Sequence, residues 1–168
     1  LRFIRDLKNQ YPLHDYQRLA PILADLRITK SNIEVELIKK ACEITEAGFR
    51  RVLKFIKPGV KEYEVEAELI HEYLSHGSDG FAYDPIIGSG KNACVLHYLE
   101  NHDTCEDGQM LLMDVASRYA NYNSDLTRTV PVNGRFTDRQ RAVYDAVLRT
   151  MRAVSYTHLR AHETQTQR

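Results

Sequence analysis

The chain has 168 residues, of which 43% are hydrophobic, and this composition supports one cored domain and excludes a disordered protein. Lys and Arg together number 23, as do Asp and Glu, so no net charge attracts phosphate backbones or anionic lipid. We therefore expect neither a nucleic acid nor a membrane as a partner. No apolar run approaches the roughly 20 residues needed to span a bilayer, and the first residues contain no signal-peptide core. Cys42, Cys94 and Cys105 lack paired spacing, which favours a reducing cytoplasm over a disulfide framework.

Residues 1–26 mix charged and apolar side chains around Pro12 and Pro21, a pattern typical of a connector from an earlier domain. The domain itself is predicted to occupy residues 27–154. Ser31-Asn32-Ile33-Glu34 is a capping box, and apolar residues recur after it at helical spacing until Pro58-Gly59. A second amphipathic helix is predicted from about Glu62 to His76.

The chain then changes to β character. Four short segments rich in β-branched and aromatic residues are separated by Gly, Asn and Asp, and we predict that they form one sheet: Phe81 to Ile87, Ala93 to Tyr98, Gln109 to Ala116, and Asn123 to Val132. A second capping box, Thr137-Asp138-Arg139-Gln140, starts a helix that continues to Val154. This order predicts an α+β domain in which helices pack on one face of an antiparallel sheet.

Residues 155–168 do not continue the apolar period of the preceding helix. The segment also resembles the translation of a sequencing adapter. We therefore predict that it is extraneous and poorly packed; a natural frayed tail is the alternative.

Two aspartates are the first candidates for chemistry. With a hairpin tip at Arg118 to Asn121, Ser117 pairs with Tyr122, and Asp114 faces Asp125 across the strands. Two such charges about 5 Å apart repel by roughly 3 kcal/mol at an effective dielectric near 20. Either the pair shares a proton, or a divalent cation lies between the carboxylates. Solvated surface acids are the alternative.

Carboxylate oxygens suit manganese, magnesium or calcium, and an imidazole in the site would admit iron, cobalt or zinc. Thr127 shares the strand face of Asp125 by period-two alternation, so its hydroxyl could orient a ligand. His97 lies in the apolar segment Val95-Leu96-His97-Tyr98, where it is either a core residue or, beside a metal, a group that transfers protons.

These segments together resemble aminopeptidase P and prolidase, metallopeptidases of the pita-bread fold. The resemblance rests on His97-Tyr98, on Met113-Asp114-Val115-Ala116, and on Asp125-Leu126-Thr127-Arg128-Thr129 followed by Pro131. It covers roughly residues 27–154 and implies that the chain is the first half of a pita-bread fold.

By this resemblance, Asp114 would be a terminal ligand of one ion and Asp125 would bridge both ions of a dinuclear centre, typically manganese. His97 would contact the substrate and steer protons. The implied substrate is a peptide with proline at the second position, and a homodimer of the complete protein is compatible with the family. A later histidine and two glutamates complete the ligand set of the family. We therefore expect the 168-residue chain to be inactive alone.

Two other functions stay open. A prolidase, which cleaves only dipeptides, shares the same motifs. A pita-bread binding protein without metals is the second alternative, although the presence of both Asp114 and Asp125 argues against it.

Overall fold

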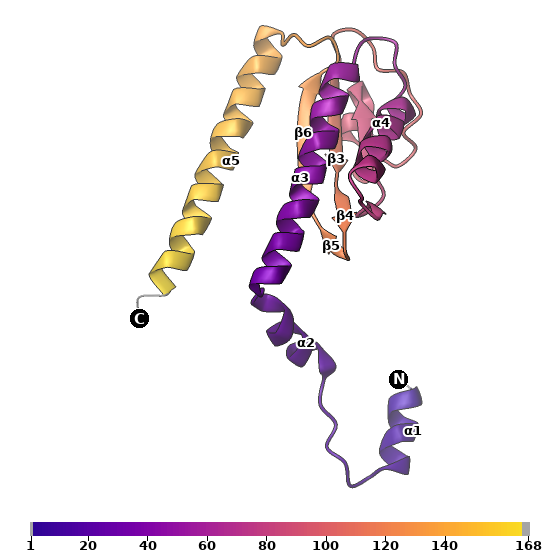
Figure 1. Cartoon of the computed structure of the whole chain (residues 1–168), viewed down its shortest axis with the longest axis vertical. Helices are drawn as coiled ribbons and strands as arrows, with labels where there is room; N and C mark the ends of the chain where they lie inside the picture. The colour runs from indigo at the N-terminus through magenta and orange to yellow at the C-terminus, as the bar shows by residue number, and fades with distance from the viewer. Residues whose placement is uncertain (1, 166–168) are drawn as a thin grey trace. The chain divides into compact units, whose positions relative to one another are not determined.

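The computed structural model describes the backbone of residues 2–165 (Figure 1) and the side chains of residues 2–157. The chain divides into two compact units, Leu1–Glu36 and Leu37–Arg168. None of the helices in the described residues is long and apolar enough to cross a bilayer.

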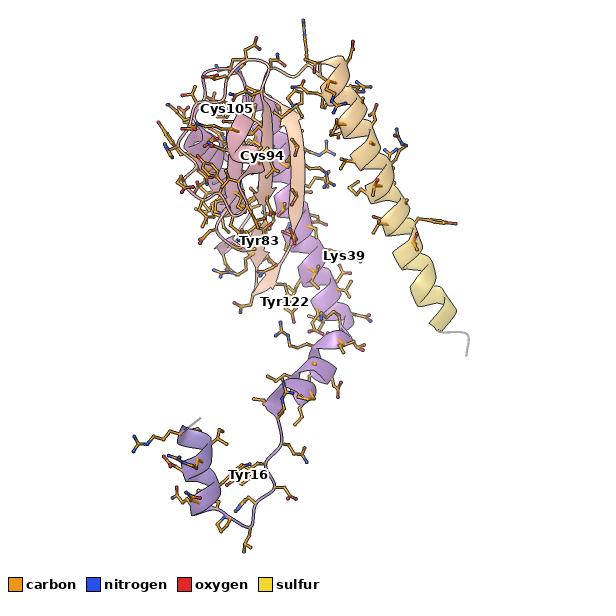
Figure 2. All side chains as sticks on the ribbon, turned by 180° about the vertical axis from the view of Figure 1, so that it is seen from behind. Tyr16, Lys39, Tyr83, Cys94, Cys105 and Tyr122 are labelled. Atoms are coloured by element: carbon orange, nitrogen blue, oxygen red, sulfur yellow. The ribbon has the colours of Figure 1, made fainter. Side chains whose placement is uncertain are left out.

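The first unit consists mainly of two short helices, α1 (Arg2–Gln10) and α2 (Leu19–Ile28), in which no described residue is buried. The Tyr16 hydroxyl (Figure 2) lies 2.8 and 3.0 Å from the carbonyl oxygens of Leu7 and Tyr11, either of which can accept its hydrogen, and so it connects the segment that follows α1 to that helix. A segment without buried side chains has no core of its own. The assignment of residues 1–26 as a connector stays a prediction.

The predicted helical pair is confirmed as α3 (Asn32–Phe55) and α4 (Glu62–Ser75). At the start of α3, the Ser31 backbone N–H donates to the Glu34 carboxylate at 2.6 Å, and the Glu34 N–H donates back to the Ser31 hydroxyl at 3.4 Å. The capping box therefore forms as expected. The buried residues recur every three or four positions and are Ala41, Ile44, Thr45, Gly48 and Val52 on α3, and Glu62, Val65, Leu69 and Tyr73 on α4.

Gly48 allows α3 and α4 to approach closely. A Cβ atom at this position would lie 2.5 Å from Cε1 of Tyr73, well inside van der Waals contact. The absence of a side chain therefore makes room for the Tyr73 ring, which is fully buried against α3.

The strands form two three-stranded antiparallel sheets rather than the single sheet that we predicted. The first has the order β2 (Ile86–Ser89), β3 (Met110–Val115), β6 (Leu126–Pro131), and the second has the order β1 (Gly80–Phe81), β4 (Ser117–Tyr119), β5 (Tyr122–Asn123). The regular ladder is interrupted at Ala116 and at Ser124–Asp125. Asp125 lies in the second interruption.

One face of β3 belongs to the helical core. Leu111, Met113 and Val115 alternate with half-buried residues along the strand, as the pleat requires. They form one buried cluster with Ile44 and Val52 of α3 and with Leu69 and Tyr73 of α4. Helices α3 and α4 thus pack on one face of this sheet, as expected for the predicted α+β domain, and Asp114 lies on the opposite face.

The predicted strand Ala93 to Tyr98 is wrong. Residues Gly90–Cys94 form a short 3-10 helix, η1, and a turn that includes His97 follows it. Two local features favour this fold. A Cβ at Gly88 would lie 2.9 Å from the Asn92 carbonyl carbon, so the glycine allows η1 to fold back onto β2. Gly90 has a φ of 54°, a conformation that a strand does not contain.

The last helix, α5 (Asp138–Gln165), begins with the predicted capping box between Thr137 and Gln140. It continues past Val154, so the predicted end of the helix is wrong. The Ser155 and Thr157 hydroxyls donate to carbonyl oxygens four residues earlier, at 3.0 and 2.8 Å, which lets polar residues continue the helix.

Residues 155–157 are exposed, as we expected for a poorly packed segment. Whether 155–168 is extraneous stays a prediction. The side chains from residue 158 onward, and residues 166–168 altogether, lie outside the described part of the chain.

Candidate functional site

Asp114 and Asp125 converge on one tyrosine hydroxyl. Asp114 is half-buried in β3, and Asp125 is exposed just before β6. Tyr83 lies in the loop after β1 and is labelled in Figure 2. Its hydroxyl is 2.8 Å from Oδ1 of Asp114 and 3.0 Å from Oδ1 of Asp125. The two carboxylate oxygens can therefore be no farther apart than the combined length of these hydrogen bonds, about 6 Å, which is close enough for one divalent cation and its coordination shell.

The predicted pairing of Asp114 with Asp125 is wrong in register. Asp114 lies opposite Thr127, and Tyr119 lies opposite Tyr122. The reason is a tighter hairpin: Ala120 and Asn121 have φ values of 49° and 65°, which is typical of a two-residue turn. The shift amounts to two residues, so Asp125 keeps its predicted face and becomes a diagonal neighbour of Asp114.

A buried hydroxyl cluster from Thr45, Ser117 and Ser124 supports the interruption that contains Asp125. Thr45 Oγ1, on α3, accepts the Ser117 backbone N–H at 2.8 Å and lies 2.6 Å from Ser124 Oγ. The Ser124 hydroxyl also donates to the Ser117 carbonyl at 3.0 Å. Because Ser124 precedes Asp125 directly, the cluster fixes the backbone on which this carboxylate is mounted. Sequence reasoning missed it, since isolated Ser and Thr residues give no spacing signal.

Tyr83 is the functional residue that sequence reasoning missed most clearly. No motif or spacing in the sequence links Tyr83 to Asp114, which lies 31 residues away. Burial raises the pKa of the Tyr83 hydroxyl above its usual value, and the hydrogen bonds to Asp114 and Asp125 together with their negative charges raise it further. The hydroxyl therefore stays protonated and remains a donor to the carboxylates.

Thr127 lies directly opposite Asp114 in the ladder. In the described residues its hydroxyl makes no hydrogen bond to either aspartate. Thr127 also lines an apolar cleft of about 440 Å³ between the sheet and α5, to which Val143, Val147 and Met151 contribute. Its role beside the carboxylates stays a prediction.

His97 is exposed and lies in the turn that follows η1, with a φ of 54°. This correction replaces the strand environment that the apolar neighbours suggested. Among the residues that the structure describes, the imidazole has no hydrogen-bond partner and no ion pair with Asp114 or Asp125. The ring is therefore available to an external group, and its function near the aspartates stays a prediction.

The carboxylates and the hydroxyl are the candidate for part of a metal site. Within the described residues there is no group of three His, Cys, Asp or Glu side chains that could hold an ion. Two converging carboxylates nevertheless fit a hard divalent cation, which prefers oxygen ligands and needs more of them than two aspartates supply. The residues present are thus compatible with part of a ligand set.

Known proteins are similar to this chain in sequence. Residues 36–164 match metallopeptidase family M24. Xaa-Pro aminopeptidase of Escherichia coli (strain K12) is 41% identical over 131 residues, and human Xaa-Pro dipeptidase is 40% identical over 141 residues. The matches cover 78% and 81% of this chain but only 30% and 29% of those relatives, so the chain spans about a third of their length.

Solved structures of aminopeptidase P are similar to this chain in both fold and sequence. Proline aminopeptidase P II from Yersinia pestis matches with a TM-score of 0.78 and 42% identity, over 80% of this chain and 31% of that one. Zinc-substituted aminopeptidase P of E. coli in complex with product matches with a TM-score of 0.79 and 40% identity, over 80% and 31%. These likenesses confirm the predicted pita-bread fold. The match over residues 36–164 and the convergence of Asp114 and Asp125 lead to one conclusion: the chain belongs to metallopeptidase family M24.

Proposed function

We propose that this chain is the first half of the catalytic domain of a metal-dependent aminopeptidase, which releases the N-terminal residue from peptides with proline at the second position. The observation that supports this best is the convergence of the Asp114 and Asp125 carboxylates on Tyr83. The similarity to Xaa-Pro aminopeptidases supports the proposed reaction and substrate class.

In this proposal, Asp114 and Asp125 hold the divalent ions, two of them in the complete enzyme, with manganese as the proposed metal. When bound, such ions supply the Lewis acidity that activates water and polarises the scissile carbonyl. The Tyr83 hydroxyl orients the carboxylates by hydrogen bonding, and Thr127, on the same sheet face, assists Asp114.

His97 serves the substrate rather than the metal. Its ring is exposed and has no partner among the described residues, so a ring nitrogen can donate to or accept from a bound peptide. An imidazole can both accept and donate a proton, which suits it to move the proton that peptide cleavage requires.

Prolidase activity is the second candidate, because human Xaa-Pro dipeptidase is about as similar to this chain as the aminopeptidases are. Substrate length separates the two activities. The proposed location is the cytoplasm, with which three free cysteines are compatible. A homodimer of the complete protein is also part of the proposal.

The test uses a protein in which this chain continues to the length of its relatives. We expect it to release the first residue of an Xaa-Pro-Xaa peptide, with a rate that added manganese increases. Asp125→Asn should lower kcat by about 100-fold or more because it removes a charge that bridges the ions. Asp138→Asn, at the exposed start of α5, is the matched control and should leave turnover nearly intact.

Three results would change the proposal. Turnover of Xaa-Pro dipeptides but not of longer peptides would favour prolidase. Equal activity of the Asp125→Asn variant would remove the metal role of this residue. Robust manganese-dependent turnover by the 168-residue chain itself would show that these carboxylates need no further ligands.

A further inference from the structure

A second carboxylate, Glu62, is more deeply buried than either aspartate of the candidate site. It is the first residue of α4 and is 0% exposed. Its Oε1 accepts the backbone N–H and the hydroxyl of Ser89, both at 2.7 Å, and the Asn92 amide at 3.3 Å. Its Oε2 accepts the Tyr98 hydroxyl at 2.7 Å and the Asp103 N–H at 3.0 Å. All five donors are neutral, although buried charges are usually paired with opposite charges.

These donors have one feature in common. They come from residues 89–103, which we name the His97 loop because His97 lies near its middle. Ser89 precedes the loop's 3-10 helix and Asp103 ends the loop, so a single carboxylate holds both ends. Tyr98, the direct neighbour of His97, is held by the same carboxylate and also accepts the Asn92 amide at 3.0 Å.

A second acid on α4 holds the far side of the loop. Glu66 lies one helical turn after Glu62 and therefore on the same side of α4. The Asn101 amide donates to the Glu66 carboxylate at 3.0 Å and to the Pro85 carbonyl at 2.9 Å, and Asn101 Oδ1 accepts the Ile87 N–H at 3.0 Å. Asn101 is 3% exposed, so this attachment is also shielded from water.

His97 itself contributes nothing to its own placement. Its φ of 54° lies in the left-handed region, which non-glycine residues rarely adopt unless their surroundings impose it. In the described residues its ring has no partner, and Leu96 beside it is 86% exposed. Among the side-chain attachments of the loop, the Tyr98–Glu62 hydrogen bond is the closest to His97 along the chain.

We propose that Glu62 is a positioning residue, which acts through the Tyr98 hydroxyl to hold the His97 backbone in the left-handed conformation that presents the imidazole to the substrate. The proposal rests on the proposed role of His97. It assigns a function to α4, which contributes no residue to the carboxylate pair. The physical basis is that the buried Glu62 carboxylate, which accepts five hydrogen bonds from the loop, holds the loop in one defined position.

The first experiment measures order in the 168-residue chain by ¹⁵N relaxation. Tyr98→Phe removes one hydroxyl, which donates to Glu62 and accepts the Asn92 amide, and it leaves the other four donors to Glu62 in place. The backbone order parameter at His97 should fall from about 0.85 to below about 0.6. Residues of α3 should keep their values. Tyr63→Phe is the matched control, since Tyr63 also lies on α4 but is 52% exposed and its hydroxyl makes no hydrogen bond in the described residues. Unchanged order at His97 in Tyr98→Phe would overturn the proposal.

The second experiment measures kinetics in the longer enzyme. Tyr98→Phe should lower kcat by about 10- to 100-fold, because small misplacements of a reacting group are costly, while KM stays within about twofold. In a His97→Asn background, Tyr98→Phe should have almost no effect on kcat, because the imidazole that Tyr98 positions is already absent. An equal loss of kcat in both backgrounds would show a general structural effect and overturn the positioning role.

Glu62→Gln is the second variant. It keeps the shape of the side chain but places an amide donor among donors, so it should reproduce the loss of order at His97 if the chain folds. If this variant does not fold, Tyr98→Phe still decides the matter. An absence of Xaa-Pro turnover in the unmodified longer enzyme would refute the proposed function alone, because the relaxation experiment does not depend on activity.

Discussion

Asp125→Asn should stabilise the metal-free chain even though it damages the proposed site. The Asp114 and Asp125 carboxylates lie within hydrogen-bond distance of the same hydroxyl, so two negative charges are held close together. At an effective dielectric near 20, their repulsion is about 3 kcal/mol. Asp125 is exposed, and screening reduces exposed interactions to about 1 kcal/mol or less. We therefore expect the free energy of unfolding to rise by about 1 kcal/mol in the variant.

Added manganese should make the unmodified chain more stable than the Asp125→Asn variant. A cation between the carboxylates turns their repulsion into attraction, and at ten times its dissociation constant it stabilises the folded chain by about 1.4 kcal/mol. The unmodified chain should show this gain, and Asp125→Asn should lose most of it. For a domain of this size, each kcal/mol corresponds to a change in Tm of about 3 to 5 °C.

Urea unfolding followed by circular dichroism measures both effects, in a chelator and in manganese. The stabilisation of the metal-free variant should shrink in about 1 M salt, where the Debye length is about 3 Å. Asp79→Asn is the control, because Asp79 is exposed and its carboxylate has no partner in the described residues. A metal-free Asp125→Asn chain that is less stable than the unmodified chain, with its manganese response intact, would refute the reasoning.

Two further predictions concern the scaffold. Gly48→Ala should lower the free energy of unfolding by about 1 to 2 kcal/mol, because the new Cβ would lie 2.5 Å from the Tyr73 ring and the cost of this overpacking exceeds the gain in helix propensity. Urea unfolding measures the change, and a variant more stable than the unmodified chain would contradict the close contact. Burial alone would raise the pKa of the Glu62 carboxyl, but the hydrogen bonds from Ser89, Tyr98 and Asp103 lower it below its ordinary value of 4.5. The stabilisation that the ionised Glu62 carboxylate contributes should therefore be complete above pH 4.5 and disappear as the pH falls through the lowered pKa. In Glu62→Gln, the free energy of unfolding should therefore fall less steeply with decreasing pH; an equally steep fall in the variant would contradict this.

The sequence predicted most reliably what local interactions determine. The capping boxes at Ser31 and Thr137 formed because their partners lie three residues apart. Asp114 and Asp125 were placed on the correct face because a register error of two residues preserves the face.

What the sequence could not predict depends on contacts between distant residues. The apolar run around His97 has strand composition, yet Glu62 and Asn101 hold it as a turn from outside the run. Tyr83 reaches the aspartates through the fold alone, since 31 residues separate it from Asp114. The two-residue tip at Ala120 and Asn121 was missed because the sequence contains no glycine there to indicate positive φ values.

The Tyr83 hydroxyl has a single hydrogen and two acceptors. At any instant only one of Asp114 and Asp125 receives that hydrogen, and the other carboxylate faces the lone pairs of the phenol oxygen. The three groups are therefore locally frustrated: no arrangement of one proton satisfies them all. Sites of this kind are where a sequence departs from the most stable choice for its own fold. A cation would remove the frustration without moving the backbone, because both carboxylates could turn toward the same positive charge.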